Sequence, residues 1–198
     1  MIRRSALAAH RAEPAQPHQL RDSARVVAVG LHRHCAIAQG LLAVRVALRR
    51  EFDRFEKQVH AMARCNTQAR LLMSVPGVGA IVSLTFAAAI DDPARFKSSK
   101  QVGAYFGLTP TKYQSGETDI DGRISKIGDA GVRAVLYEAA NIILTKPLKG
   151  CTALKSWAMK LARRSGMKKA KVALARKLAV IMHRMLAGGM SFRNVATV

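Results

Sequence analysis

Acidic residues are scarce in this sequence. It has 12 Asp and Glu against 33 Lys and Arg, for a formal net charge of +21. No acidic residue follows Glu138, whereas residues 146–193 contain 13 Lys or Arg. A positive field of this kind attracts polyanions. The balance favours nucleic acid as the partner, and an anionic membrane surface or a ribosomal RNA site has the same electrostatics.

Cysteines and long apolar runs are also few. The three cysteines, Cys35, Cys65 and Cys151, are odd in number and none belongs to a CxxC pair, which argues against a disulfide framework and against a zinc site. The longest apolar run, residues 78–90, is too short to span a bilayer. The N-terminus lacks a clean signal pattern. We therefore expect a cytoplasmic protein with no membrane partner.

Two segments precede the main domain. Residues 1–35 mix Arg, His, Ala and Pro without lasting periodicity, which predicts a disordered or spurious segment. Residues 36–66 predict one long amphipathic helix. Its apolar residues are Leu41, Leu42, Val44, Val46, Leu48, Phe52, Phe55 and Val59. Since a solitary amphipathic helix needs a partner, we expect a coiled coil or a helical hairpin with another subunit, and so a homo-oligomer through this segment.

Residues 67–193 predict a mainly α domain with a small β/loop insertion, and residues 194–198 a tail. Helices are expected over 67–73 and 80–90, from a Ser98 or Ser99 cap to about residue 105, from an Asp129 cap to Pro147, and over 151–164 and 167–187. Residues 107–128 predict an ordered loop with short strands around 111–113 and 123–125. The expected core is Leu72, Val82, Leu84, Phe106, Leu108, Val135, Leu136, Ile143, Leu154, Trp157, Leu161, Leu178 and Met182.

The turn between the first two helices has the form of a helix-hairpin-helix. In Pro76-Gly77-Val78-Gly79, two glycines let the backbone approach a phosphate, and the second helix points its free N–H groups at it. Such a contact gives affinity without sequence information. The plainer interpretation is a helical turn with glycine caps.

The last helix has a basic face opposite its apolar one. At about 100° per residue, Lys169, Arg176, Lys177 and Arg184 share one side. Most such faces are only solvated, but the absence of any compensating Glu favours a surface that contacts phosphates. His183 fits a packed or surface position better than a ligand.

Ser115 is the candidate nucleophile. It lies in a glycine-bounded loop, and Lys112, Arg123 and Lys126 are near enough in sequence to hold a phosphate. A serine beside a glycine is more often a simple turn residue, so composition alone does not favour catalysis.

The order of short motifs along the chain is more specific than any one of them. They are Pro-Gly-Val-Gly at 76–79, Phe-Gly-Leu-Thr-Pro at 106–110, Ser-Gly at 115–116, Gly-Arg-Ile-Ser-Lys-Ile-Gly at 122–128, Glu-Ala-Ala at 138–140 and a late run at 170–179. From about Leu71 to Phe192 this series resembles the C-terminal domain of the IS110/IS116/IS902 family of transposases.

The resemblance implies a bacterial, nucleoid-associated DNA recombinase that cuts and joins strands for an insertion sequence. It implies that a loop serine, here Ser115, attacks the DNA phosphate. It also implies an N-terminal RuvC-like domain whose acidic residues bind Mg²⁺, an element-encoded guide RNA, and an oligomeric protein. Residues 1–60 contain carboxylates only in Arg-rich or helical settings. We therefore expect that domain to be missing, no metal to be held by this chain, and recombination to be incomplete without it.

Two other functions fit the same residues. One is a non-catalytic helix-hairpin-helix nucleic-acid-binding protein or transposase remnant, which regulates a full-length relative through mixed oligomers. The other is a basic RNA-associated protein of ribosomal type.

Overall fold

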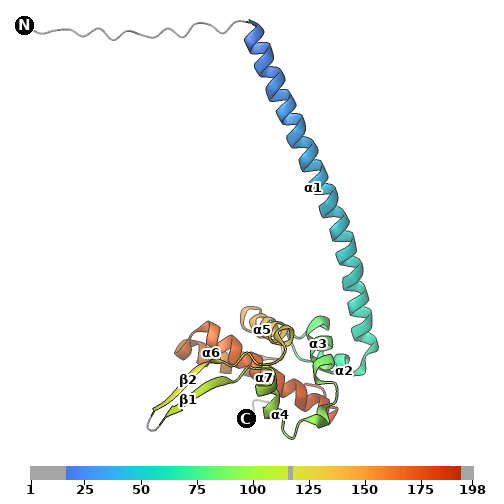
Figure 1. Ribbon diagram of the computed structural model, residues 1–198. Coiled ribbons are helices and arrows are strands. Elements are labelled where there is room, and N and C mark those ends of the chain that lie inside the picture. The colour runs from blue at the N-terminus through green and yellow to red at the C-terminus, as the bar shows by residue number, and fades with distance from the viewer. Residues whose placement is uncertain (1–16, 116–117, 193–198) are drawn as a thin grey trace, which may run out of the picture. The chain divides into compact units, whose positions relative to one another are not determined.

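The computed structural model describes residues 17–115 and 118–192, which are mainly helical (Figure 1). The predicted fold class is confirmed, with a long N-terminal helix, a helical domain and a small strand insertion. The chain divides into two compact units, of which the first ends at Arg54 and the second begins at Phe55. The predicted divisions at residues 35, 66 and 193 stay predictions.

Helix α1 spans Pro17–Cys65 and begins earlier than expected. The helix overlaps residues 17–35 of the segment predicted to be disordered or spurious, and residues 1–16 lie outside the described part. Proline is tolerated at the first helical position, because its missing N–H would have no partner there, and no other proline follows before Pro76. Several large apolar side chains of the first unit are exposed along α1: Ile37, Leu41, Leu42, Val44, Val46, Leu48 and Phe52.

Three short helices follow at nearly the predicted bounds: α2 Thr67–Leu72, α3 Ala80–Ile90 and α4 Ser99–Tyr105. A 3₁₀ helix that was not predicted, η1, spans Pro93–Arg95. Local caps explain these bounds. The Asn66 side chain accepts a hydrogen bond from the Ala69 N–H at 2.9 Å, and Ser98 caps α4 as predicted.

The predicted loop contains a β-hairpin with strands β1 Pro110–Ser115 and β2 Thr118–Ile124. The strands are antiparallel, with Ser115 opposite Thr118 and Pro110 opposite Ile124, and a bulge interrupts the register near Pro110. They are longer than the two short strands expected. The hairpin projects from the helices, and neither strand has more than marginal contact with a helix (Figure 1).

The remaining helices are α5 Ala130–Thr145, α6 Thr152–Ser165 and α7 Met167–Gly188. Asp129 caps α5 as predicted, since its carboxylate accepts the Gly131 and Val132 N–H groups. Helix α7 is central, because it packs against α5, α6, α4 and α2. None of the described helices has both the length and the apolar character that crossing a bilayer requires.

Most of the predicted core is buried. The largest buried side chains include Leu72, Phe106, Leu136, Ile143, Leu178 and Met182. Leu84, Val135 and Leu161 are only partly buried. The expectation for Trp157 was wrong, because its side chain is 37% exposed. Leu154 and Ala158 form the buried face of α6, and Trp157 lies beside that face with Lys177 over its ring.

Candidate nucleic-acid interface

The two glycines of the predicted phosphate-binding turn have different surroundings. Gly77 has φ +89°, and a Cβ built on it would lie 2.8 Å from Cγ1 of Ile143 in α5. The Cα of Gly77 therefore packs against the core. Gly79 is exposed and a Cβ there would meet nothing within 4 Å. Packing inside the chain thus explains a glycine at 77 and gives no reason for one at 79.

Gly79 is also the N-cap of α3. The Ser83 N–H bonds to the Gly79 carbonyl at 3.0 Å as the first intrahelical bond, so the preceding N–H groups of the first turn lack intrahelical partners. This is the geometry expected of a backbone anion contact. A helix-hairpin-helix as such is not shown, and DNA binding by residues 76–79 stays a prediction.

The turn lies beside the end of α7. The Phe192 N–H donates a hydrogen bond to Oγ of Ser74 at 2.9 Å, and the two residues are 118 positions apart in the sequence. The segment that follows α7 is therefore held next to the residues that lead into Pro76.

The predicted basic face of α7 is at the surface. Lys169, Arg176 and Arg184 are exposed and Lys177 is half-buried. Two of these side chains have specific neighbours. Nζ of Lys177 lies 4.4 Å from the centre of the Trp157 ring, a cation–π contact. A Cβ on Gly103 of α4 would lie 3.0 Å from Cγ of Arg176, so that glycine allows α7 and its arginine to approach.

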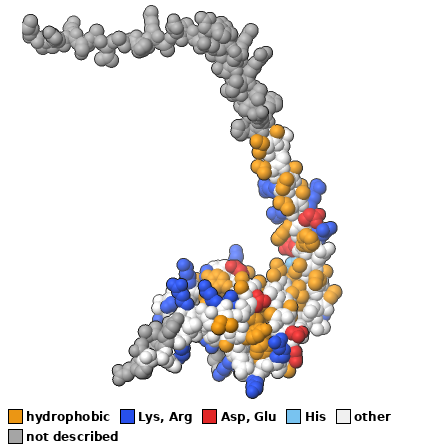
Figure 2. All heavy atoms as spheres, viewed as in Figure 1, with side chains coloured by type: hydrophobic (Ala, Val, Ile, Leu, Met, Phe, Trp, Pro, Cys, Tyr) orange, Lys and Arg blue, Asp and Glu red, His pale blue; other side chains and the backbone are white. Residues whose placement is uncertain are grey.

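Lys and Arg side chains gather on the face that Figure 2 shows, over the region of α5 and α6. Exposed residues of α6 contribute to this basic character: Lys160, Arg163 and Arg164. The sequence pattern of α7 alone did not reveal them. The feature of the sequence that pointed to a basic surface on α6 was the lack of any acidic residue after Glu138.

Ser115 is exposed at the end of β1 and the predicted cations are not gathered around it. Lys112 stands three positions earlier, and the alternation of side chains along a strand puts the two on opposite faces. Arg123 and Lys126 belong to the other end of the hairpin. The six residue steps from Thr118 to Ile124 span roughly 20 Å.

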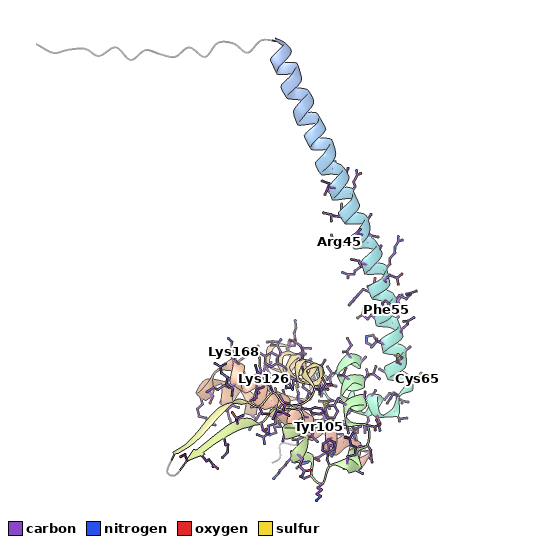
Figure 3. All side chains as sticks on the ribbon, in the orientation of Figure 1. Arg45, Phe55, Cys65, Tyr105, Lys126 and Lys168 are labelled. Atoms are coloured by element: carbon purple, nitrogen blue, oxygen red, sulfur yellow. The ribbon has the colours of Figure 1, made fainter. Side chains whose placement is uncertain are left out.

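The base of the hairpin is formed by two segments that cross at two glycines. The Lys126 N–H donates to the Gly107 carbonyl at 3.1 Å, and the Ser125 N–H to the Thr109 carbonyl at 2.9 Å. Lys126, labelled in Figure 3, has φ +56°, which is uncommon for a residue other than glycine. Gly107 has φ +65° and Gly128 has φ +88°, a backbone conformation that glycine adopts most easily. This explains the glycine in the motif at 106–110 and the last glycine in the motif at 122–128.

Arg133 is a residue that the sequence did not single out. Its Nη1 atom lies 2.8 Å from the Gly128 carbonyl oxygen, 3.2 Å from that of Phe106 and 3.3 Å from that of Ile127. It therefore bonds to both segments of the hairpin base. Only its place one turn after the Asp129 cap hinted at this position.

His183 is a packed residue, as predicted. It is buried, its Nδ1 lies 2.9 Å from the Ser99 hydroxyl oxygen, and its Nε2 lies 3.1 Å from the Pro93 carbonyl oxygen. Since Nε2 must donate to that carbonyl, Nδ1 accepts from Ser99 in the neutral ring. The histidine thus ties α7 to η1 and α4.

Among the side chains that the structure describes, no three of His, Cys, Asp or Glu come close enough together to hold a metal ion.

Residues 69–151 match the family model described as Transposase IS116/IS110/IS902 family. That range contains the turn, the hairpin and α5. Three similar proteins illustrate the wider likeness. They are the transposase for insertion sequence element IS1111A of Coxiella burnetii, a probable family 20 transposase of Pseudomonas aeruginosa and the transposase for insertion sequence element IS1328 of Yersinia enterocolitica.

The three identities are 34%, 30% and 28%, over 70%, 71% and 66% of this chain. The aligned parts cover 38%, 41% and 39% of the relatives. The chain thus spans about two fifths of the length of these relatives.

Proposed function

Because the chain belongs to the IS116/IS110/IS902 family of transposases, we propose that it binds DNA and supplies Ser115 as the nucleophile for strand cleavage and joining. The observation that carries the proposal is the position of Ser115, which is exposed at the far end of the projecting hairpin. A hydroxyl there can reach a DNA phosphate without displacing any of the helical core.

The chemistry is transesterification. Oγ of Ser115 forms a bond to the phosphorus, the bond from phosphorus to one sugar oxygen breaks, and the serine proton passes to a base while the released sugar hydroxyl takes a proton. Reversal on a second strand end joins DNA and frees the serine. A serine needs an activating base and cations around the phosphate.

Arg123 and Lys126 lie at the other end of the hairpin from Ser115, so we propose that a further domain or subunit completes the site. Mg²⁺ held there by carboxylates would neutralise charge on the phosphate. On its own the chain is then competent to bind DNA and incompetent to recombine it.

DNA binding is proposed to use the exposed N-terminus of α3 at Gly79 together with the basic face of α7. Both contact the sugar-phosphate backbone, so affinity is high and sequence preference low. The same face suits a structured guide RNA as a second polyanion. A chain held on DNA in this way would be associated with the nucleoid.

Self-association is proposed to use α1. Ile37, Leu41, Val44, Leu48 and Phe52 recur every three or four residues, and each is about half exposed or more. Spacing of this kind forms the seam of a coiled coil. Burying the seam against a second copy removes this apolar surface from water.

The test compares Ser115→Ala with Ser156→Ala, a serine exposed on α6. Each variant is incubated with element-end DNA in the presence of the N-terminal half of a similar transposase, and covalent protein–DNA adducts are resolved on a denaturing gel. We expect adducts from the unaltered chain and from Ser156→Ala, and none from Ser115→Ala. Adducts that persist in Ser115→Ala would remove the nucleophile assignment.

A non-catalytic DNA-binding role is the second candidate. It is favoured by the roughly 20 Å that separate Ser115 from Arg123 and Lys126 along the hairpin. Under this alternative the chain binds DNA, forms mixed oligomers with a full-length relative, and yields no adduct in any combination.

A further inference from the structure

The hairpin that carries Ser115 is attached to the domain only at its base. Its strands pair with each other and make at most marginal contact with the helices. Its length of roughly 20 Å makes it a lever. A tilt of about 10° at the base moves the far end by roughly 3.5 Å, from the lever length and the angle alone. A misplacement of about 1 Å already costs on the order of 10²-fold in rate at a catalytic centre.

The side chain of Arg133 bonds to both segments of the hairpin base. The Phe106 carbonyl belongs to the segment that leads into β1, and the Ile127 and Gly128 carbonyls to the segment that leaves β2. Nη1 of Arg133 shares its two N–H bonds among these three oxygens. Since Arg133 lies in the first turns of α5, the contact also fixes both segments to that helix.

The charge and shape of arginine suit this place. Three carbonyl oxygens gather partial negative charge, and no carboxylate of the described residues pairs with Arg133. In a planar guanidinium the two N–H groups of Nη1 point in fixed directions, and Nη1 is the atom that bonds to both segments. A lysine ammonium has three donors, but it rotates freely at the end of a flexible stem, so it holds the two segments less rigidly.

We propose that Arg133 is the positioning residue for Ser115: it sets the direction of the β1–β2 hairpin and so places the hydroxyl on the DNA phosphate. This inference rests on the proposed function. It adds a residue that itself touches neither the DNA nor the reacting atoms.

The first arm of the test measures hairpin direction without DNA. Spin labels are placed at Gln114→Cys in β1 and Lys160→Cys in α6, with the exposed Cys35 and Cys65 changed to serine. We expect a narrow distance distribution in the parent chain and in Arg95→Ala, a control that removes one exposed arginine of η1. We expect a broad distribution in Arg133→Ala and an intermediate one in Arg133→Lys. A narrow distribution in both Arg133 variants would overturn the proposal.

The second arm measures covalent adduct formation with the N-terminal half of a relative supplied. Arg133→Lys keeps the positive charge and should disturb the fold less than Arg133→Ala. In this variant we expect the rate of adduct formation at saturating DNA to fall about 10²-fold, while the apparent Kd for DNA stays unchanged. An unchanged rate beside an active parent chain would overturn the proposal. If the parent chain forms no adduct, the proposed function fails, and the distance distributions still decide what Arg133 does.

Discussion

Gly107 lies so close to the backbone of Ile127 that a Cβ on Gly107 would stand 2.1 Å from the Ile127 carbonyl oxygen. A second contact between the same two segments is equally close, since a Cβ on Gly128 would stand 2.1 Å from the Tyr105 carbonyl oxygen. Both obstacles are backbone atoms, which cannot rotate away. The two segments of the hairpin base therefore cross at distances that only glycine permits.

Gly107→Ala should lower the free energy of unfolding by about 2–4 kcal/mol, because it adds both a backbone clash and the cost of a positive φ. Chemical denaturation followed by circular dichroism measures this loss. Gly79→Ala is the control, since that site has φ −93° and open space. Equal stability of the two variants would show that the hairpin base relaxes easily.

The two glycines of the 76–79 turn should separate stability from DNA binding. Gly77→Ala should destabilise the fold, because the added Cβ would clash with the Ile143 side chain. The DNA affinity of the folded molecules should change little. Gly79→Ala should keep the fold and weaken DNA binding several-fold, because its methyl group intrudes where the backbone approaches a phosphate. Fluorescence anisotropy with labelled duplex, paired with melting curves, distinguishes the two effects. Unchanged affinity in Gly79→Ala would exclude the α3 N-terminus as a contact.

A matched pair of valines tests self-association through α1. Val44 and Val46 are 56% and 49% exposed, and two helical steps of about 100° place them on nearly opposite sides of the helix. Val44→Asp should dissociate the oligomer, because it puts a charge into the proposed seam, whereas Val46→Asp should not. Light scattering coupled to size-exclusion chromatography gives the mass. A monomeric parent chain, or identical behaviour of the two variants, contradicts a seam at Val44.

The basic face of α7 should set the salt dependence of DNA binding. Each lost phosphate contact reduces the slope of log K against log salt by about 1. Lys169→Ala and Arg184→Ala should each do so, and Lys97→Ala, outside the helices, should leave the slope unchanged. Since Lys177 covers the chain's single tryptophan, DNA binding should also change Trp157 emission. Equal slopes in all variants would place the DNA elsewhere.

Cys151 should be the least reactive cysteine. Desolvation by burial raises the pKa of its thiol, and the positive charge of Lys155 offsets this in part. Cys35 and Cys65 are exposed, so alkylation near pH 8 followed by mass spectrometry should label them first. Labelling of Cys151 at the same rate as Cys35 and Cys65 would show that the structure around Cys151 unfolds locally and often.

The same shift predicts a pH effect on stability. With its folded pKa above the unfolded value of about 8.5, Cys151 contributes its full stability below that pH. The contribution is lost as the pH rises through the folded pKa. The difference in Tm between the parent chain and Cys151→Ala should therefore narrow toward alkaline pH.

Local signals explain how closely the helices follow the predicted bounds. Asp129 and Ser98 cap the helices that follow them, and glycines end α6 and α7. Such signals act within a few residues, so they can be recognised without knowing the fold. The helix over residues 17–35 was not predicted because it has no clear apolar period, and the hairpin was underestimated because its strands have few apolar residues.

The sequence by itself determined the mainly helical class, the order of elements, the basic face of α7 and the family. It did not determine which side chains meet. Gly77 packs on Ile143, Arg133 reaches Phe106, and Phe192 bonds to Ser74. It also placed Lys126 near Ser115 in sequence, whereas the hairpin separates the two in space. Periodicity and caps are properties of neighbouring residues, but these contacts join residues far apart in the chain, and only the packing of the helices and the pairing of the strands decides them.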